Sequence, residues 1–245
     1  MTLYAIGDVH GQLGQLDRAL ALIEADGGRD ASVVFMGDYV DRGPDSRAVI
    51  QRLIDGLEAG RDWTCLKGNH DRMMEWFFEP EPRHDPHLLI GFHWFHERIG
   101  GADTLASYGV QIEPLTRLND LQKQALPHIP LDHLAFLRGL KTTHVVGDLL
   151  FVHAGMRPGV ALQDQTEEDL LWIRQPFHEF ERPHPHLVIH GHTPVDEATH
   201  YGNRVNIDTG AGYGRRLDPV AIEGRRVFAL TDQGRVELKP RDSRA

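Results

Sequence analysis

The heptapeptide Gly37-Asp38-Tyr39-Val40-Asp41-Arg42-Gly43 decides how this sequence folds, because it directly follows a short apolar run at residues 33–36. A short apolar run bounded by glycine is typical of a buried strand, so the heptapeptide begins where a strand ends. In α/β proteins the loops at the carboxyl ends of strands carry the chemistry. A carboxylate such as Asp38 can hold a metal ion there, and an arginine such as Arg42 can hold a phosphate.

Four more loops of the same character follow apolar runs that we expect to be strands. They are Gly7-Asp8-Val9-His10-Gly11, Gly68-Asn69-His70-Asp71, His153-Ala154-Gly155 and Gly191-His192-Thr193. Glycines next to polar residues let the backbone turn tightly and approach a ligand closely. The repetition of one pattern at five strand ends indicates a single site built from distant parts of the chain.

The five loops offer three nitrogen and three oxygen donors, from Asp8, His10, Asp38, Asn69, His153 and His192. Six donors are too many for one tetrahedral ion. They suit two divalent ions that share one carboxylate, an arrangement that drives in-line displacement at phosphorus. His190 is a rival to His192, because residues two apart on a strand share a face. We favour His192, since it is the histidine of the Gly-His-Thr loop.

Four further side chains fit the chemistry of a phosphoester. Arg42 and Arg174 are expected to neutralise phosphate oxygens by bidentate contacts. His70 is expected to protonate the leaving group. Asp41 would fix the imidazole tautomer of His70 and raise its pKa through the opposite charge.

The remaining pattern predicts one α/β domain over residues 1–245. The chain opens as strand, helix, strand, helix, which favours a largely parallel sheet. Residues 73–140 read as a helical insertion, with one of its helices at residues 88–99. Strands return at 142–146 and 149–152 as a hairpin, and Thr166 is expected to cap a helix. The last strands, at residues 204–208, 219–222, 227–230 and 236–238, read as an antiparallel meander, and residues 239–245 as a frayed tail.

Composition limits the classes of function. The 245 residues carry a formal net charge of −10, which disfavours nonspecific nucleic-acid binding. The single Cys65 excludes an internal disulfide, and its apolar surroundings predict a buried side chain. We find no signal peptide and no apolar run near the ~20 residues of a membrane span, so we expect a cytoplasmic protein without a membrane partner. The oligomeric state stays open.

In order and identity, the five motifs resemble those of the phosphoprotein phosphatase family of metallophosphoesterases. The stretches Gly100–Gly109 and Asp208–Gly214 are similar to those of compact bacterial and phage serine/threonine phosphatases. The resemblance implies a calcineurin-like β-sandwich flanked by helices, with the metals at the strand ends. It also implies two divalent ions, typically Mn²⁺ with Fe and Zn as alternatives.

The resemblance assigns a role to each motif residue. It implies that Asp8 and His10 hold the first ion, that Asp38 bridges, and that Asn69, His153 and His192 complete the second site. His70, paired with Asp41, would be the general acid, and Arg42 and Arg174 would bind phosphate. The implied activity is hydrolysis of phosphomonoesters, foremost phosphoserine and phosphothreonine in proteins.

Three alternatives remain. The first is a hydrolase of dinucleoside tetraphosphates or of other small phosphoesters. Symmetrical dinucleoside tetraphosphate hydrolases are a sister group that tends to lack the residues equivalent to Asp41 and Thr193, and this chain has both. Other members with Asp-Arg-Gly also hydrolyse nucleotides, so these two residues exclude this alternative only in part. A metal-dependent nuclease is disfavoured by the acidic charge. An inactive metal-binding scaffold would show a lost ligand or a lost acid, and the sequence shows neither.

Overall fold

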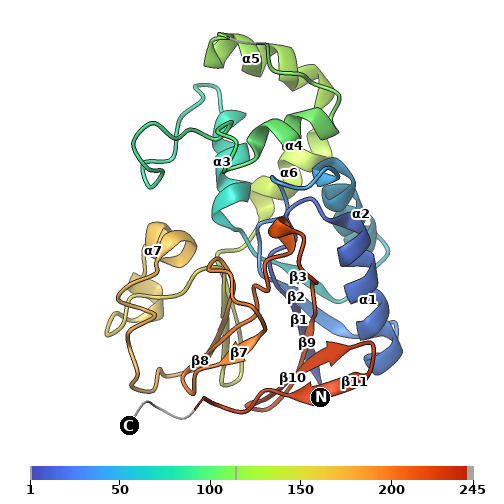
Figure 1. Ribbon diagram of the computed structural model, residues 1–245, viewed down its shortest axis with the longest axis vertical. Coiled ribbons are helices and arrows are strands. Elements are labelled where there is room, and N and C mark those ends of the chain that lie inside the picture. The colour runs from blue at the N-terminus through green and yellow to red at the C-terminus, as the bar shows by residue number, and fades with distance from the viewer. Residues whose placement is uncertain (1, 114, 242–245) are drawn as a thin grey trace.

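The computed structural model describes residues 2–113 and 115–241, and it has two stacked β-sheets with helices on both outer sides (Figure 1). The mixed α/β class and the sandwich predicted from the motifs are therefore confirmed. No helix within the described ranges combines the length and the apolar character that a membrane crossing requires.

The first sheet has the strand order β11-β10-β9-β1-β2-β3. Its members are β1 (Leu3–Ile6), β2 (Ser32–Phe35), β3 (Trp63–Cys65), β9 (Val220–Glu223), β10 (Arg226–Thr231) and β11 (Gly234–Glu237). β1, β2 and β3 run parallel, whereas β9, β10 and β11 form an antiparallel meander whose first strand pairs with β1.

The second sheet has the order β4-β5-β6-β8-β7. Its members are β4 (Thr143–Val146), β5 (Leu149–Val152), β6 (Leu187–His190), β7 (Thr199–His200) and β8 (Arg204–Asn206). The expected hairpin is confirmed, since β4 pairs antiparallel with β5. The prediction for residues 204–208 is wrong. Instead of joining the meander, β8 runs parallel to β6 in the other sheet, where Val205 of β8 and Ile207 just after it pack into the apolar cluster between the sheets.

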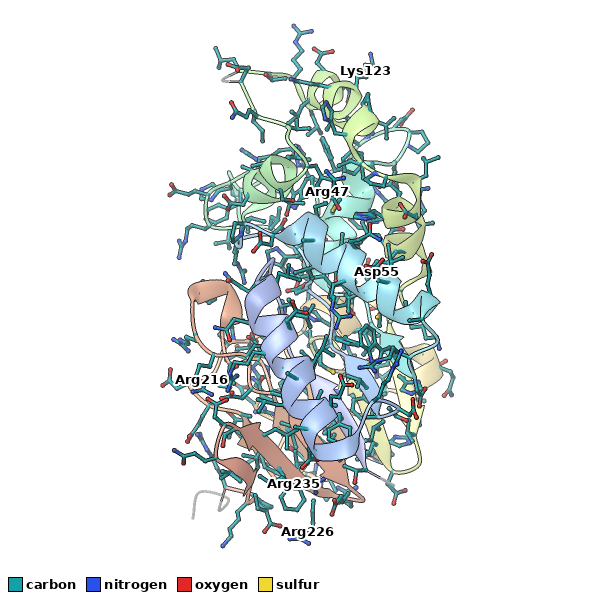
Figure 2. The ribbon with its side chains drawn as sticks, turned by 90° about the vertical axis from the view of Figure 1, so that its right-hand side faces the viewer. Arg47, Asp55, Lys123, Arg216, Arg226 and Arg235 are labelled. Carbon is teal, nitrogen blue, oxygen red and sulfur yellow. The ribbon has the colours of Figure 1, made fainter. Side chains whose placement is uncertain are left out.

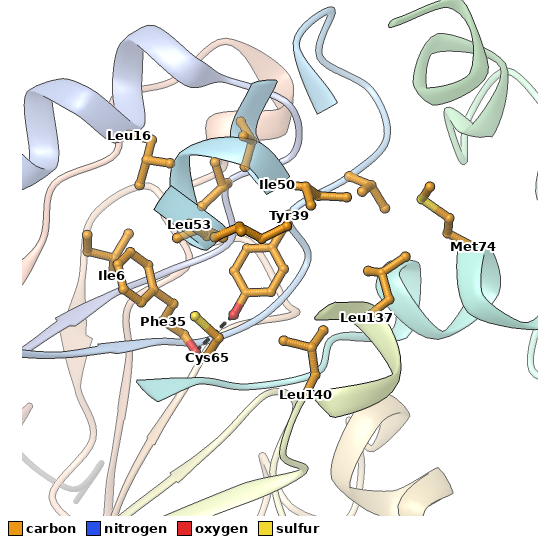
Figure 3. Close-up of a cluster of buried hydrophobic side chains, with 14 of the residues drawn as sticks. Ile6, Leu16, Phe35, Tyr39, Ile50, Leu53, Cys65, Met74, Leu137 and Leu140 are labelled. Carbon is orange, nitrogen blue, oxygen red and sulfur yellow. Dashed lines mark hydrogen bonds between the residues drawn. The ribbon is translucent and has the colours of Figure 1, made fainter. Parts of the chain in front are cut away.

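The strands alternate their side chains between two buried layers. Ile6 and Phe35 face the helices, while Ala5 and Val34 from the same strands face the second sheet. A third cluster, around Leu150 and Phe177, covers the outer face of the second sheet. Figure 3 shows the first of these clusters, with Tyr39 reaching from the loop after β2 into the packed side chains.

Seven α-helices occur in the described residues: α1 (Leu13–Gly27), α2 (Ser46–Glu58), α3 (Asn69–Phe77), α4 (Gly101–Ser107), α5 (Leu118–Ala125), α6 (Leu131–Gly139) and α7 (Glu167–Trp172). Helix α2 is amphipathic, because Ile50 and Leu53 are buried while Arg47 and Asp55 are exposed on its outer side (Figure 2). Thr166 caps α7 as predicted, since its hydroxyl accepts from the Asp169 amide at 3.2 Å.

The helix predicted at residues 88–99 is absent, so that expectation is wrong. Turns replace it, because Gly91 adopts a left-handed backbone (φ +84°) and Trp94 points inward to a polar partner described below. The insertion is helical only at α3, α4, α5 and α6. Of the tail expected to fray, residues 242–245 lie outside the described chain, and the Arg241 amide donates to the His200 carbonyl at 2.8 Å.

Candidate active site

The loops that follow β1, β2 and β3 of the first sheet meet the loops that follow β5 and β6 of the second. All six residues predicted to bind metal are at most 7% exposed, and they are Asp8, His10, Asp38, Asn69, His153 and His192. Parallel strands place their carboxyl ends at one edge, so loops far apart in sequence converge there.

Asp38 stands between histidines of the two sheets. Its Oδ2 lies 3.5 Å from His10 Nε2 and 3.4 Å from His153 Nε2. The opposite ring atoms of both histidines face backbone carbonyls, because His10 Nδ1 lies 2.8 Å from the Val40 oxygen and His153 Nδ1 lies 2.9 Å from the Met36 oxygen. Nδ1 therefore carries the proton, and the unprotonated Nε2 of each ring faces Asp38, as a metal ligand requires.

A second group of donors adjoins the first. Asn69 Oδ1 lies 3.0 Å from His153 Nε2 and 2.8 Å from His192 Nδ1. The Nε2 atom of His192 is buried and has no hydrogen-bond partner among the described residues. Asp38, His153 and His192 place ligand atoms within 4.8 Å of one another, and so do His10, Asp38 and His70.

Asp8 lies beside these groups rather than within them, and the His192 amide donates to its Oδ2 at 3.1 Å. Asp208, which the sequence analysis did not select, is 3% exposed. Burial raises the pKa of Asp8 well above its usual range, and the charge of Asp208 raises it further. Burial raises the pKa of Asp38 to about 7 and that of Asp208 to about 6. These three buried carboxylates have too few cationic side chains nearby to neutralise them, and bound divalent ions would supply the missing positive charge. The residues present therefore fit a pair of metal ions.

The backbone is strained where the site is built. Positive φ values outside glycine occur in the described chain at His10 (+47°), Asp38 (+52°), Asp41 (+74°), Arg42 (+68°), His192 (+67°) and one residue elsewhere, Leu115 (+66°). Left-handed backbone is unfavourable for residues with a Cβ and concentrates at functional sites. Asp71 supports the strained loop after β2, because its carboxylate accepts from the amides of Gly68, Asp38 and Tyr39.

His70 and Asp41 form the expected pair. His70 Nδ1 lies 2.6 Å from Asp41 Oδ2, and both side chains are buried. Burial and the charge of Arg42 lower the pKa of His70 well below its usual range. Burial of the imidazolium and the positive charge of Arg42 therefore outweigh any rise in the His70 pKa that the Asp41 carboxylate causes.

The two predicted arginines lie beside the same donors. Arg42 Nη2 lies 3.1 Å from His70 Nε2 and Arg42 Nη1 lies 2.6 Å from His10 Nε2, and the guanidinium packs over the exposed Tyr213 ring at 4.8 Å. Arg174 is exposed just beyond α7, and its charge partly opposes the rise in the Asp38 pKa that burial causes. Both cations thus stand at the accessible side of the metal-ligating group.

His190, the rival ligand, points elsewhere. Its Nε2 lies 3.2 Å from Arg204 Nη1, and its ring packs against Phe177 at 5.1 Å. Neither group of ligand atoms includes it.

Two side chains from the insertion that the sequence analysis did not select as site residues also reach this site. Trp94 Nε1 and Thr104 Oγ1 both donate to the carboxylate of Asp41. They lie 53 and 63 residues from Asp41 along the chain. No local motif links them to the heptapeptide, so only the fold reveals them.

Known proteins are similar to this chain in sequence and in fold. The profile of the calcineurin-like phosphoesterase family matches residues 1–208. A serine/threonine-protein phosphatase 1 of Salmonella typhimurium is 29% identical over 90% of this chain and 92% of its own. A symmetrical bis(5'-nucleosyl)-tetraphosphatase of an Acidovorax species is 35% identical over 64% of this chain, and the match spans 45% of that relative's length.

A crystal structure assigned provisionally as a diadenosine tetraphosphatase superposes with a TM-score of 0.64 at 20% identity. It covers 97% of this chain and 94% of the other, and it bears on the fold alone. The family match extends through every motif residue from Asp8 to His192 and reaches Asp208. The chain therefore belongs to the family of calcineurin-like phosphoesterases.

Proposed function

We propose that this metallophosphoesterase hydrolyses phosphomonoesters, foremost phosphoserine and phosphothreonine in proteins. The single observation that carries this proposal is the buried Asp41–His70 pair beside Arg42. A phosphomonoester with an alkyl leaving group needs a proton donor, and this pair supplies one next to a cation that can hold the phosphate.

In the proposed assignment Asp8 and His10 would hold one divalent ion, Asn69, His153 and His192 would hold the other, and the Asp38 carboxylate would serve both. We assign Mn²⁺ to both positions. Bound there, the ions would polarise the phosphate and lower the pKa of the attacking water. His70 also lies near His10 and Asp38, but its Nδ1 is engaged by Asp41, so we assign it to proton transfer rather than to metal binding.

The side chains of this chain perform the remaining steps. Arg42 and Arg174 bind the phosphate oxygens and hold the ester in line. A phosphate that engages the Arg42 guanidinium takes it away from His70 Nε2, which leaves that nitrogen free to carry a proton. His70 then donates this proton to the departing alkoxide, while Asp41 stabilises the imidazolium through Nδ1.

Hydrolysis of dinucleoside tetraphosphates is the second candidate, and the relative that favours it is the Acidovorax enzyme. The Asp41–His70 pair supports the monoester assignment, because nucleotide leaving groups depend less on a general acid than serine alkoxides do.

The deciding experiment uses the full chain, stripped of metal and restored with Mn²⁺. Its rates are compared on a phosphoserine peptide, a phosphotyrosine peptide and diadenosine tetraphosphate. We expect the phosphoserine peptide to have the highest kcat/KM. A higher value for the dinucleotide would replace the proposal with the second candidate, and metal binding without turnover of any substrate would contradict both.

A further inference from the structure

We propose that Trp94 and Thr104 are positioning residues for proton transfer by His70, acting through the carboxylate of Asp41. This inference rests on the proposed role of His70 as general acid. Through these two residues, the insertion at residues 73–140 would contribute to the rate of the reaction and not only border the active site.

The hydrogen bonds around Asp41 fix both of its carboxylate oxygens. Oδ2 accepts from His70 Nδ1 at 2.6 Å and from Trp94 Nε1 at 2.9 Å. Oδ1 accepts from Thr104 Oγ1 at 2.7 Å and from Trp94 Nε1 at 3.0 Å. With donors on both oxygens, the carboxylate cannot rotate without breaking a buried hydrogen bond, so Oδ2 stays aimed at the imidazole.

The backbone of Asp41 is held by the same neighbours. Its amide lies 2.8 Å from Thr104 Oγ1 and 3.1 Å from Ser46 Oγ. Since Asp41 has a left-handed backbone and a fully buried side chain, its position depends on these contacts. Thr104 therefore acts on both the main chain and the carboxylate of one residue.

The insertion has a shape that permits this contact. Gly100 has φ +99°, and a Cβ there would lie 2.3 Å from the Arg42 amide nitrogen. A Cβ on Gly101 would lie 2.7 Å from the Trp94 ring. The glycine pair thus allows the start of α4 to approach the heptapeptide closely enough for Trp94 and Thr104 to reach Asp41.

A merely structural role and a positioning role differ in their dependence on the leaving group. Loss of proton transfer slows esters of poor leaving groups and spares those of good ones. Loss of fold or of metal slows both alike. The informative comparison is therefore between a simple alkyl phosphate and 4-nitrophenyl phosphate, both with the Mn²⁺-restored protein.

The variants are Thr104→Val, which keeps the side-chain volume but removes the hydroxyl, and Trp94→Phe, which removes the indole N–H. We expect each to lower kcat on the alkyl phosphate by about tenfold, with less than about a twofold change on 4-nitrophenyl phosphate and little change in KM. Thr104→Ser restores the hydroxyl and should restore kcat. Phe77→Leu alters packing against Trp94, whose ring lies 5.1 Å away, and should leave the ratio of the two rates unchanged.

His70→Asn separates this inference from the function on which it rests. If His70→Asn loses the same fraction of activity on both substrates, His70 is not the general acid, and the positioning role proposed for Trp94 and Thr104 is wrong as well. A selective loss in His70→Asn, combined with unselective loss or no loss in Thr104→Val and Trp94→Phe, would overturn the positioning role alone. Melting temperature and bound metal are measured for every variant, so that Thr104→Val decides the question if Trp94→Phe is unstable.

Discussion

The carboxylate of Asp38 receives contacts from both sheets. Its Oδ2 lies within 3.5 Å of one histidine from each sheet, and its Oδ1 accepts from the His70 amide at 2.9 Å. Gly68 packs directly against it, since a Cβ on Gly68 would lie 2.1 Å from Oδ1. The position of this one side chain is therefore fixed on all sides before any ion arrives.

Replacing Asp38 with Ala should abolish the binding of both ions, because it removes the carboxylate that both candidate ligand groups share. Metal analysis after gel filtration should find about two Mn²⁺ per chain in the unaltered protein and far less in Asp38→Ala. Asp196→Ala is the control, since the Asp196 side chain is 97% exposed. Two ions per chain in Asp38→Ala would show that the bridging assignment is wrong.

His133 gives a prediction about pH. It is fully buried, with Nδ1 2.7 Å from the Tyr108 hydroxyl and Nε2 3.0 Å from Gln51 Oε1, and burial lowers its pKa. The unfolded chain, with a histidine pKa near ~6.5, then binds the proton first as pH falls. The contribution of neutral His133 to the free energy of unfolding is fully present above about pH 6.5 and is lost as the pH falls below that value.

His133→Gln should therefore gain stability relative to the unaltered protein as pH decreases from 7.5 to 5.5, by up to about 1.4 kcal/mol per pH unit. Urea unfolding at the two pH values, with chelator present in both, measures the difference. A difference that is independent of pH would show that His133 is not the titrating group.

At the residue scale the motifs predicted which side chains converge, because each ligand follows its own strand and glycines mark the turns. Asp208 and Trp94 were not predicted. Asp208 follows β8, whose parallel pairing with β6 is a long-range contact, and Trp94 lies in a segment whose apolar pattern suggested a helix. Both depend on tertiary structure that no local pattern encodes.

At the scale of elements, one buried ion pair joins the loop after α3 to α3 itself and to α7. Arg72 on α3 is 1% exposed, and its Nη2 lies 2.8 Å from Asp85 Oδ2. The Trp172 indole at the end of α7 donates to the same oxygen at 3.1 Å. The Trp172 ring in turn packs against the His192 ring at 5.8 Å, so this pair supports one wall of the active site.

Arg72→Met should reduce the free energy of unfolding by about 3–5 kcal/mol, because it leaves the buried Asp85 without its cation. The matched control is Arg83→Met, which breaks an exposed pair with Glu79 at 3.0 Å and should cost less than about 1 kcal/mol. Urea unfolding measures both variants. A similar decrease in the free energy of unfolding in both variants would show that the buried Arg72–Asp85 pair stabilises the fold no more than the exposed pair does.

The sequence predicted helices and strands correctly where the hydrophobic pattern extended over a whole element. Helices α1 and α2 and strands β1, β5 and β6 lie where their patterns indicated. Residues 88–99 do not form the helix that their pattern indicated, since a run of apolar and aromatic residues fits a helix as well as a folded-back loop. There the hydrogen bond from Trp94 to Asp41 and the left-handed Gly91 outweigh helix propensity.

At the scale of the whole molecule, the proposed metal pair links two sheets that otherwise meet through apolar side chains. Ligands from both sheets make the ions a cross-link of the folded state, and anything that binds only the folded state stabilises it. At about 100 times its Kd, one ion contributes about 2.7 kcal/mol.

Adding Mn²⁺ to the protein after its metal has been removed with a chelator should therefore raise the melting temperature by about 5 °C or more. Asp38→Ala, measured alongside, should show no such rise. An equal rise in both would mean that the stabilising ion binds outside the proposed site.

The central place of β1 in the first sheet has a consequence for synthesis on the ribosome. β1 pairs with β2 on one side, but its other side is covered by β9, which begins at Val220. Every proposed metal ligand precedes that strand in the chain and is therefore synthesised before it. Until then the nascent sheet presents an open edge of amides and carbonyls, which is where partly made chains associate. Nascent chains that stall before β9 is made are accordingly the form of this protein most in need of a chaperone.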